Sequence, residues 1–251
     1  MRCALLLGLT LVASTAPAGE LPAPEQYKLR VEYQEWRPDL SAELRSGLLG
    51  TRLDLKDDLG IEDERTFEVR GALQLASGFK IRGSVTPLDY LADVRIDRTF
   101  VFNGRVYPVS ARVVSEVNGK LYSAHLEFDF LKTPAGYLGV MIGGELFDGR
   151  ASIAAPQFGL SEAEELNTPV PVVGATGRLY VGRLSFEGEL TGLTIGERGH
   201  TYELRFGARF HIVEHVAVGA GYRLFKIEGQ DDPDFVDFRQ GGLTFGAELS
   251  L

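Results

Sequence analysis

Four side chains capable of acid–base or nucleophilic chemistry alternate along one segment: Ser123, His125, Glu127 and Asp129. If this segment is a β-strand, residues two apart lie ~6 to 7 Å from each other on one face. That separation is too long for the direct serine–histidine hydrogen bond that activates a nucleophile. His125, Glu127 and Asp129 could form an acid–base group. If the strand instead lined the interior of a β-barrel, ion pairs there would account for the same residues. The sequence therefore predicts no catalytic residue, cofactor site or metal site. It favours a protein that is not an enzyme and leaves the question open.

The other histidines give a second chemical signal. Loop carboxylates could converge on His200 in the folded chain. A lipid- or peptide-hydrolysing enzyme with its site at the rim of a barrel is therefore one alternative function. His211 and His215 flank a short turn, and we expect them to cap it.

From residue 27 onward, apolar and polar residues alternate with the period of two that marks amphipathic β-strands. Glycine supplies 30 of the 251 residues, above the usual ~7%, as crowded or sharply turning strands require. Ten alternating segments can be counted: 27–34, 66–76, 79–90, 122–130, 137–146, 173–181, 184–191, 202–211, 216–224 and 242–251.

The connections between these segments alternate in length. Those at 77–78 and 182–183 are two residues long, whereas the links before the second, fourth, sixth and tenth segments are mostly long and polar. Short turns at one end and long loops at the other are typical of outer-membrane barrels. The predicted fold is all-β, a single transmembrane antiparallel up-and-down β-barrel of about 10 strands, with short periplasmic turns and long extracellular loops. An even strand number places both termini in the periplasm.

The strand count depends on residues 91–119, which contain two Asn-Gly pairs, Asn103-Gly104 and Asn118-Gly119. Asn-Gly favours tight hairpin turns, so we expect a β-hairpin that projects from the second long loop. The alternative adds two spanning strands and gives twelve; eight is the other alternative. Twelve strands would place Arg98 on the lipid face at a cost of about 2 to 4 kcal/mol, which favours ten.

The polar face of the ten segments carries nine basic and nine acidic residues. A solvated surface needs no such equality, whereas a narrow polar lumen does, because buried charges must be paired. The apolar face would then meet lipid. The candidate lumen ion-pair residues are Lys28, Arg30, Glu32, Glu68, Arg70, Lys80, Arg82, Glu127, Asp129, Glu145, Arg178, Glu187, Glu189, Glu203, Arg205, Arg209, Arg223 and Glu248.

The N-terminus has the features of a secretory signal. A short basic start precedes an apolar run of about nine residues and an Ala-Pro-Ala site. We therefore expect residues 1–18 to be a cleaved signal peptide and residues 19–251 to form the barrel domain. The net charge of −9 argues against a nucleic-acid partner.

The chain ends Thr-Phe-Gly-Ala-Glu-Leu-Ser-Leu, and this octapeptide resembles the terminal signal of bacterial outer-membrane β-barrels. Thr244, Gly246, Leu249 and Leu251 occupy its four defining places, although the last residue of the family is most often Phe. The resemblance implies recognition by the barrel-assembly machinery and a location in the bacterial outer membrane. The mature chain is similar to small barrels of the OmpA/OmpW-like superfamily, and no motif points to one member.

The predicted loops carry surplus negative charge, in 54–64, 162–165 and 231–234. Clustered carboxylates could bind divalent cations such as those that bridge lipopolysaccharide phosphates. A solvated acidic surface is the favoured explanation, because no cluster has the spacing of an EF-hand. A barrel of about ten strands has a lumen that side chains fill. The predicted function is therefore a structural or surface-interaction barrel with a largely plugged lumen, in contact with outer-membrane lipids and lipopolysaccharide. A narrow pore for small solutes, lined by glycines such as Gly219, Gly221 and Gly242, is the other alternative.

Overall fold

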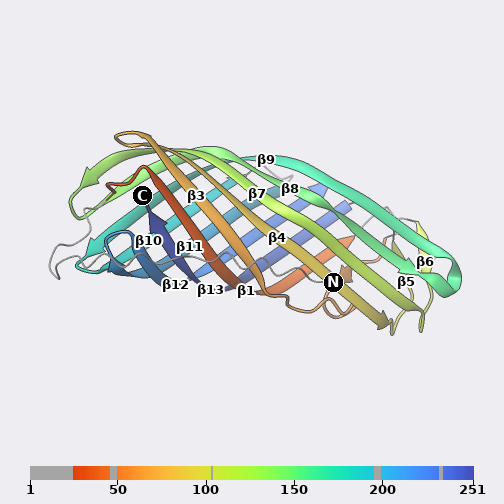
Figure 1. Ribbon diagram of the computed structural model, residues 1–251. Coiled ribbons are helices and arrows are strands. Elements are labelled where there is room, and N and C mark those ends of the chain that lie inside the picture. Colours follow the sequence, from red (N-terminus) through yellow and green to blue (C-terminus); the bar gives the residue numbers. More distant parts are fainter. Residues whose placement is uncertain (1–24, 46–49, 103, 195–198, 232–233) are drawn as a thin grey trace.

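The computed structural model describes residues 25–45, 50–102, 104–194, 199–231 and 234–251. The predicted signal peptide, 1–18, lies outside these residues. Ten long strands form a tilted, elongated barrel (Figure 1). They are β1 (Leu29–Arg45), β3 (Thr66–Ala76), β4 (Phe79–Arg95), β7 (Arg112–Thr133), β8 (Gly136–Ala155), β9 (Leu160–Val181), β10 (Leu184–Thr194), β11 (Gly199–Val213), β12 (Val216–Asp231) and β13 (Asp234–Ser250).

The barrel is antiparallel and closed. Each long strand pairs with its neighbours in the chain, and β13 returns to pair with β1 from Arg30↔Ser250 to Arg45↔Phe235. This seam closes the turn-end half of the barrel, whereas at the lid end β9 before Val173 and β4 beyond Val85 have a long partner strand on one side only. The predicted up-and-down barrel of ten strands is confirmed.

The two ends of the barrel differ in their connections. At the turn end, where the chain terminates, four hairpins close through two residues each, at 77–78, 134–135, 182–183 and 214–215. The other end carries the short strand β2 (Leu53–Asp54), the hairpin of β5 (Phe100–Phe102) and β6 (Arg105–Tyr107), and a 3-10 helix over Pro156–Phe158. We call residues 50–65 the lid and this end the lid end (Figure 1).

The β5–β6 hairpin lies where Asn103-Gly104 predicted it, with Gly104 at a φ of +72°. The expectation of a tight turn at the second Asn-Gly pair is wrong. Asn118 and Gly119 lie inside β7, and Gly119 pairs across to Gly149 of β8. A side chain at Gly119 or at Gly149 would meet the ring of Phe147. Close packing, and not a turn, therefore explains the glycine at position 119.

The outer surface of the turn-end half is an apolar belt. Its exposed side chains include Val31, Phe79, Leu126, Ile142 and Phe245. On β7 the outward apolar positions run from Tyr122 to Phe130, and nine tilted residues cover roughly 20 to 25 Å. This height matches the apolar band of membrane barrels, about 25 Å.

Polarity inverts partway along the strands. On β1 the inward residues change from Arg30 and Glu32 to Trp36 and Leu40, while outward positions change from apolar to Arg37 and other polar residues. The turn-end half is therefore apolar outside and polar inside, and the lid-end half is polar outside and apolar inside. The second arrangement is that of a barrel wall surrounded by water.

The strands extend further than the alternation predicted. Only β3 has the predicted bounds, whereas β7, β8 and β9 each run for 20 residues or more. Segment 162–165, predicted as loop, lies in β9. Among the described residues there is no helix long and apolar enough to cross a membrane.

Replacing Leu126 by Arg tests the assignment of the belt. The side chain is 57% exposed on the outward face of β7, so a guanidinium there should lower the folding free energy into lipid vesicles by about 2 to 4 kcal/mol. Urea titration of the folded fraction measures the change. The control is Asn118→Arg on the same face of β7 above the belt, where we expect little effect. A harmless Leu126→Arg would reverse the assignment of the two faces.

Candidate functional site in the barrel lumen

The inward face of the turn-end half holds a layer of charged side chains. Every predicted lumen residue except Lys28 is buried there or nearly so. Lys28 is exposed, and its backbone N–H donates to the carbonyl of Leu251 at the rim. The prediction for Lys28 was wrong because this residue precedes the first strand, where alternation no longer decides which side chain points inward.

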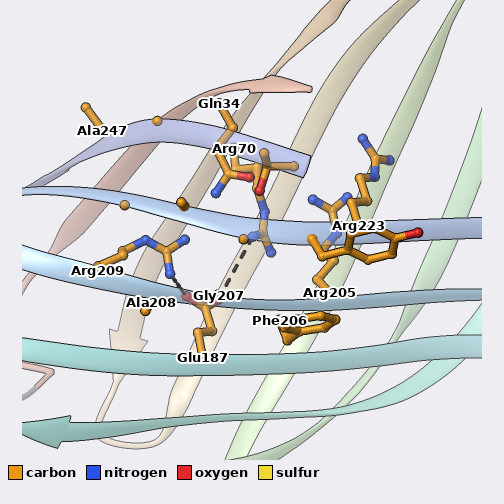
Figure 2. Close-up of a pocket in the computed structure, with 16 residues that line it drawn as sticks. Gln34, Arg70, Glu187, Arg205, Phe206, Gly207, Ala208, Arg209, Arg223 and Ala247 are labelled. Atoms are coloured by element: carbon orange, nitrogen blue, oxygen red, sulfur yellow. Dashed lines mark hydrogen bonds and ion pairs between the residues drawn. The ribbon is translucent and has the colours of Figure 1, made fainter. Parts of the chain in front are cut away.

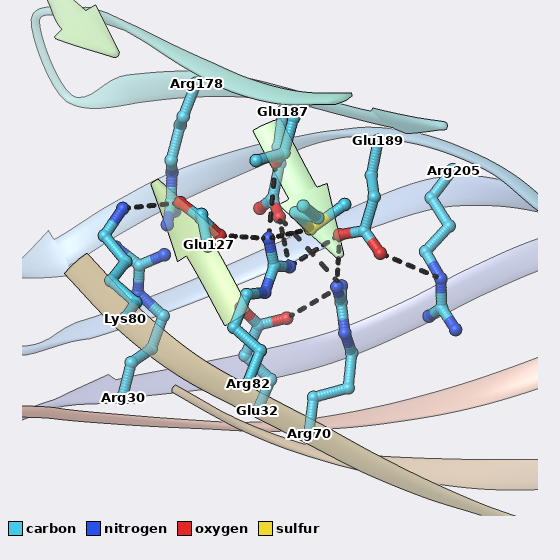
Figure 3. A network of polar contacts seen from close by, with 12 residues as sticks. Arg30, Glu32, Arg70, Lys80, Arg82, Glu127, Arg178, Glu187, Glu189 and Arg205 are labelled. Atoms are coloured by element: carbon cyan, nitrogen blue, oxygen red, sulfur yellow. Dashed lines mark hydrogen bonds and ion pairs between the residues drawn. The ribbon is translucent and has the colours of Figure 1, made fainter. Parts of the chain in front are cut away.

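Arg82 of β4 stands at the centre of the layer (Figure 3). Its guanidinium donates to Glu127 of β7 at 2.7 Å and to Glu189 of β10 at 2.5 Å. Arg70 of β3 donates to the same Glu189 oxygen at 2.6 Å. Glu187 lies 3.6 Å from Arg82. These contacts connect walls of the barrel that are far apart in sequence.

A second group extends toward the lid end. Arg205 forms a bidentate ion pair with Glu68 and also contacts Glu203 at 2.7 Å. Arg223 pairs with Glu203, and its guanidinium lies 4.2 Å from the centre of the Trp36 ring. Arg223 therefore connects the ionic layer to the apolar interior above it.

A third group lies toward the turn end. Arg209 contacts Glu187, Glu32 at 2.6 Å and Glu248 at 3.1 Å. Arg178 donates to Glu248 at 2.9 Å. Each guanidinium therefore has more than one carboxylate or hydroxyl partner, as buried cations require.

Glu25 completes the layer from outside the strands. Its carboxylate accepts hydrogen bonds from Arg30 at 2.7 Å and from the Tyr180 hydroxyl at 2.6 Å, and it lies 3.1 Å from Lys80. The backbone of Glu25 has a φ of +57°, so no strand alternation could predict which way it points. Tyr180, by contrast, shares the polar face of β9 with Arg178 and could have been read from the sequence.

The ammonium nitrogen of Lys80 forms ion pairs with three carboxylates, those of Glu25, Glu127 at 2.8 Å and Asp129 at 3.0 Å. Glu145 is buried in the same layer and forms no ion pair with a described residue. Within the described part of the chain, the lumen thus holds ten carboxylates and eight cations, where the sequence predicted equal numbers. The surplus requires protons or small cations from solution, because unpaired buried charge is costly.

The lumen glycines make room for these side chains. A Cβ on Gly219 would lie 2.7 Å from Cγ of Arg209, and one on Gly143 would lie 2.7 Å from the His125 ring. Figure 2 shows Arg70, Arg205 and Arg209 around a cavity of about 40 Å³ in this region. A second cavity near His125 measures about 20 Å³. Each has room for a few water molecules.

Above the ionic layer the interior is an apolar cluster. Trp36, Leu88, Tyr90 and Phe225 from the barrel wall are buried in it. The lid packs into it from the open end and buries Leu53, Leu59 and Ile61, while Phe100 and Tyr107 of the hairpin stack with ring centres 4.9 Å apart. A cavity of about 90 Å³ remains between the lid and the wall of β7–β9.

Acidic residues hold the lid in place. Asp54 accepts hydrogen bonds from the N–H groups of Lys56 and Asp57, both at 2.8 Å. Asp58 pairs with Arg98, which follows β4. Asp63 accepts from the N–H of Leu40 at 2.8 Å and from Lys56 Nζ at 2.9 Å. These carboxylates therefore have structural partners, and the described residues contain no group of three or more potential metal ligands.

The electrostatics of the lid follow from these contacts. Burial alone would raise the pKa of Asp58, but the hydrogen bonds from Arg98 and from the Asp54 N–H hold that pKa below its ordinary value. At Asp63, burial would likewise raise the pKa, but the hydrogen bonds from the N–H of Leu40 and from the ammonium of Lys56 hold it below its ordinary value.

The histidine and serine candidates are not brought together as a catalytic group. Ser123 Oγ lies 2.7 Å from Ser84 Oγ, and the buried His125 Nε2 has no hydrogen-bond partner among the described residues. His200 faces the outer wall, 3.6 Å from Glu228. The expectation that His211 caps a turn was wrong, since its Nε2 lies in the lumen 3.0 Å from Ser185 Oγ.

Three of the four residues of the terminal signal lie on the seam strand β13, and Leu251 directly follows it. Thr244 is buried in the lumen, and a side chain on Gly246 would lie 2.1 Å from the carbonyl oxygen of Tyr33. Leu249 and Leu251 are exposed at the turn end of the belt. The close approach of β1 to β13 therefore requires glycine at position 246, independently of any role of this residue in the terminal signal.

Replacing Glu25 by Gln tests the ionic layer. Loss of the carboxylate leaves Arg30 with one fewer partner and Lys80 less compensated, so the free energy of unfolding should fall by about 3 to 5 kcal/mol. The control is Glu35→Gln, which removes an exposed ion pair with Arg37 and should cost at most about 1 kcal/mol. Equal losses in the two variants would show that Glu25 is not part of a buried network.

Acid should release the lid. Because the pKa of Asp58 is lowered in the fold, its contribution is complete above the ordinary carboxyl pKa of about 3.9 and is lost as the pH falls through the lowered value. Pepsin cleavage within residues 50–65, followed from pH 4.5 downward, measures the release. Arg98→Gln should move the onset to higher pH, whereas Arg105→Gln, whose partner Glu162 lies in β9, should not. An unchanged onset in Arg98→Gln would contradict this account.

No protein family model matches this chain, and no curated protein sequence matches it. Solved structures do. The outer membrane protease OmpT from Escherichia coli superposes with a TM-score of 0.61 at 9% identity, over 89% of this chain and 96% of that one. The attachment invasion locus protein Ail of Yersinia pestis gives a TM-score of 0.36 at 10% identity, over 88% of this chain and 99% of that one. Outer membrane protein AlkL gives 0.39 at 15% identity, over 95% and 96%.

At such identities the likeness concerns the fold alone, and it rests on the first of these structures. The closed seam and the apolar belt are features of outer-membrane barrels in general. The chain has the fold of a small bacterial outer-membrane β-barrel.

Proposed function

We propose that this protein is an outer-membrane barrel with a closed lumen, which acts as a structural or surface-interaction protein through its lid end. The observation that carries the proposal is that two different sets of side chains fill the lumen, one in each half of the barrel. An ionic layer with cavities of about 40 and 20 Å³ occupies the turn-end half, and the apolar cluster with the lid occupies the other half. A channel for solutes needs a continuous aqueous path, and wide channels belong to barrels of about sixteen or more strands.

The polarity of the outer wall supports an orientation. The turn end carries the chain terminus and the belt, and the lid end projects a wall with a polar exterior that suits water. We therefore place both termini in the periplasm and the lid outside the cell, in contact with lipopolysaccharide and external ligands. The proposal includes removal of residues 1–18 as a signal peptide and recognition of Leu249 and Leu251 by the barrel-assembly machinery. Divalent cations at the acidic loops stay a prediction.

The two alternatives have less support. A narrow pore depended on space beside lumen glycines, and Arg209 and His125 fill that space at Gly219 and Gly143. A hydrolase at the rim depended on His200, which lies on the outer wall and faces Glu228. Among the described residues, neither His125 nor His200 has a hydrogen bond to a hydroxyl that could act as a nucleophile.

Planar-bilayer recording tests the closed lumen. Refolded protein of residues 19–251 should give no steady unit conductance steps, because the ion pairs and the lid leave no continuous water path. A sixteen-stranded porin handled identically is the positive control, and the shift of gel mobility on heating verifies that the barrel is folded. Reproducible unit steps from the folded protein would overturn the proposal in favour of the pore.

A further inference from the structure

The outer wall carries a polar groove directly above the apolar belt. It has a volume of about 560 Å³ and runs across β4, β7, β8 and β9. Tyr122, the last aromatic residue of the belt on β7, forms its lower border, and the next outward residue is Lys120. The groove therefore lies at the height of lipid headgroups, on the lid side of the belt.

Charged side chains of both signs line the groove without neutralising each other. The strand register places Lys120 opposite Asp148 and Arg150 opposite Glu165. Such cross-strand neighbours of opposite charge normally attract. In the described part of the chain, however, neither pair comes within ion-pair distance, and Asp89 across from Asn118 has no cationic partner either.

Several other charges on the outer wall are paired within the protein. Arg112, on the same face of β7, pairs with Asp93 of β4. Lys226 contacts Glu228 at 2.8 Å, and Arg37 contacts Glu35 at 2.8 Å. In the described part of the chain, two cations and three carboxylates without an ion pair therefore face this one groove, where a ligand could satisfy them.

The position and chemistry of the groove select the ligand. Lys120 and Arg150 lie diagonally across the β7–β8 pair, about 7 Å apart at their Cβ atoms, so both can reach one phosphate group. Carboxylates and the amide of Asn118 are suitable acceptors and donors for sugar hydroxyls. A lipid headgroup that carries phosphate on a sugar offers both groups at this height.

We infer that this groove binds the phosphorylated saccharide headgroup of an outer-leaflet glycolipid, with Lys120 and Arg150 on the phosphate. The inference rests on the orientation in the proposed function, which places the groove in the outer leaflet. It gives the surface-interaction role one defined site on the barrel wall, separate from the lid.

Binding of purified, folded protein to lipopolysaccharide tests the site. The double variant Lys120→Gln/Arg150→Gln removes both cations and should weaken the apparent Kd by about tenfold or more, as expected for the loss of two charge-assisted hydrogen bonds. Arg112→Gln is the matched control, since it removes an exposed cation that already has a protein partner; its Kd should change less than about twofold. Heat-modifiable gel mobility shows that each variant is folded.

Dephosphorylated lipopolysaccharide provides the second arm. The wild type should bind it as weakly as the double variant binds the native glycolipid, and the double variant should not distinguish the two. Equal affinity of wild type and double variant, an equal loss in Arg112→Gln, or undiminished binding of the dephosphorylated form would each overturn the inference. Conductance in the bilayer assay would refute the closed lumen and leave this binding result unaffected, so the two failures can be told apart.

Discussion

The structure depends on one electrostatic constraint: a charge enclosed by the barrel wall must find an opposite charge within reach. In the closed barrel, cations from β1, β3, β4, β9, β11 and β12 meet carboxylates from other parts of the wall. The contact between Arg70 and Glu189 joins residues 119 positions apart. Because each guanidinium has several partners, the layer fixes the shape of the cross-section as well as its closure.

The second constraint is the change of surroundings along the barrel axis. Where lipid covers the outside, the apolar residues face out and the ionic layer fills the inside. Where water covers the outside, residues still alternate between the two faces, but the polar ones face out and the apolar ones face in. The interior there is an apolar core that includes Trp36 and the lid. Arg223 stands at the changeover, with Glu203 on one side and the Trp36 ring on the other. Charged side chains therefore fill one half of the interior and apolar side chains fill the other.

The sequence predicted the fold and most of the lumen because alternation reports directly which side chains share a face. It located β3 residue by residue and placed the β5–β6 hairpin at Asn103-Gly104. It failed where alternation changes meaning. The lid-end extensions of β7, β8 and β9 alternate with inverted polarity and were read as loop. Glu25 and Lys28 precede the first strand, so their sides were undetermined, and the ion pair of Asp58 with Arg98 joins segments 40 positions apart in sequence.

The inversion of polarity along the strands limits how this chain can change in evolution. Insertion of a single residue near the changeover would rotate everything beyond it to the opposite face, so that a strand would send its apolar lid-end residues into water and its polar ones into the core. Insertion of two residues would preserve the faces and merely raise the level of the changeover. Length variation among descendants of this chain should therefore occur in even steps within the long strands and freely in the connections at the lid end.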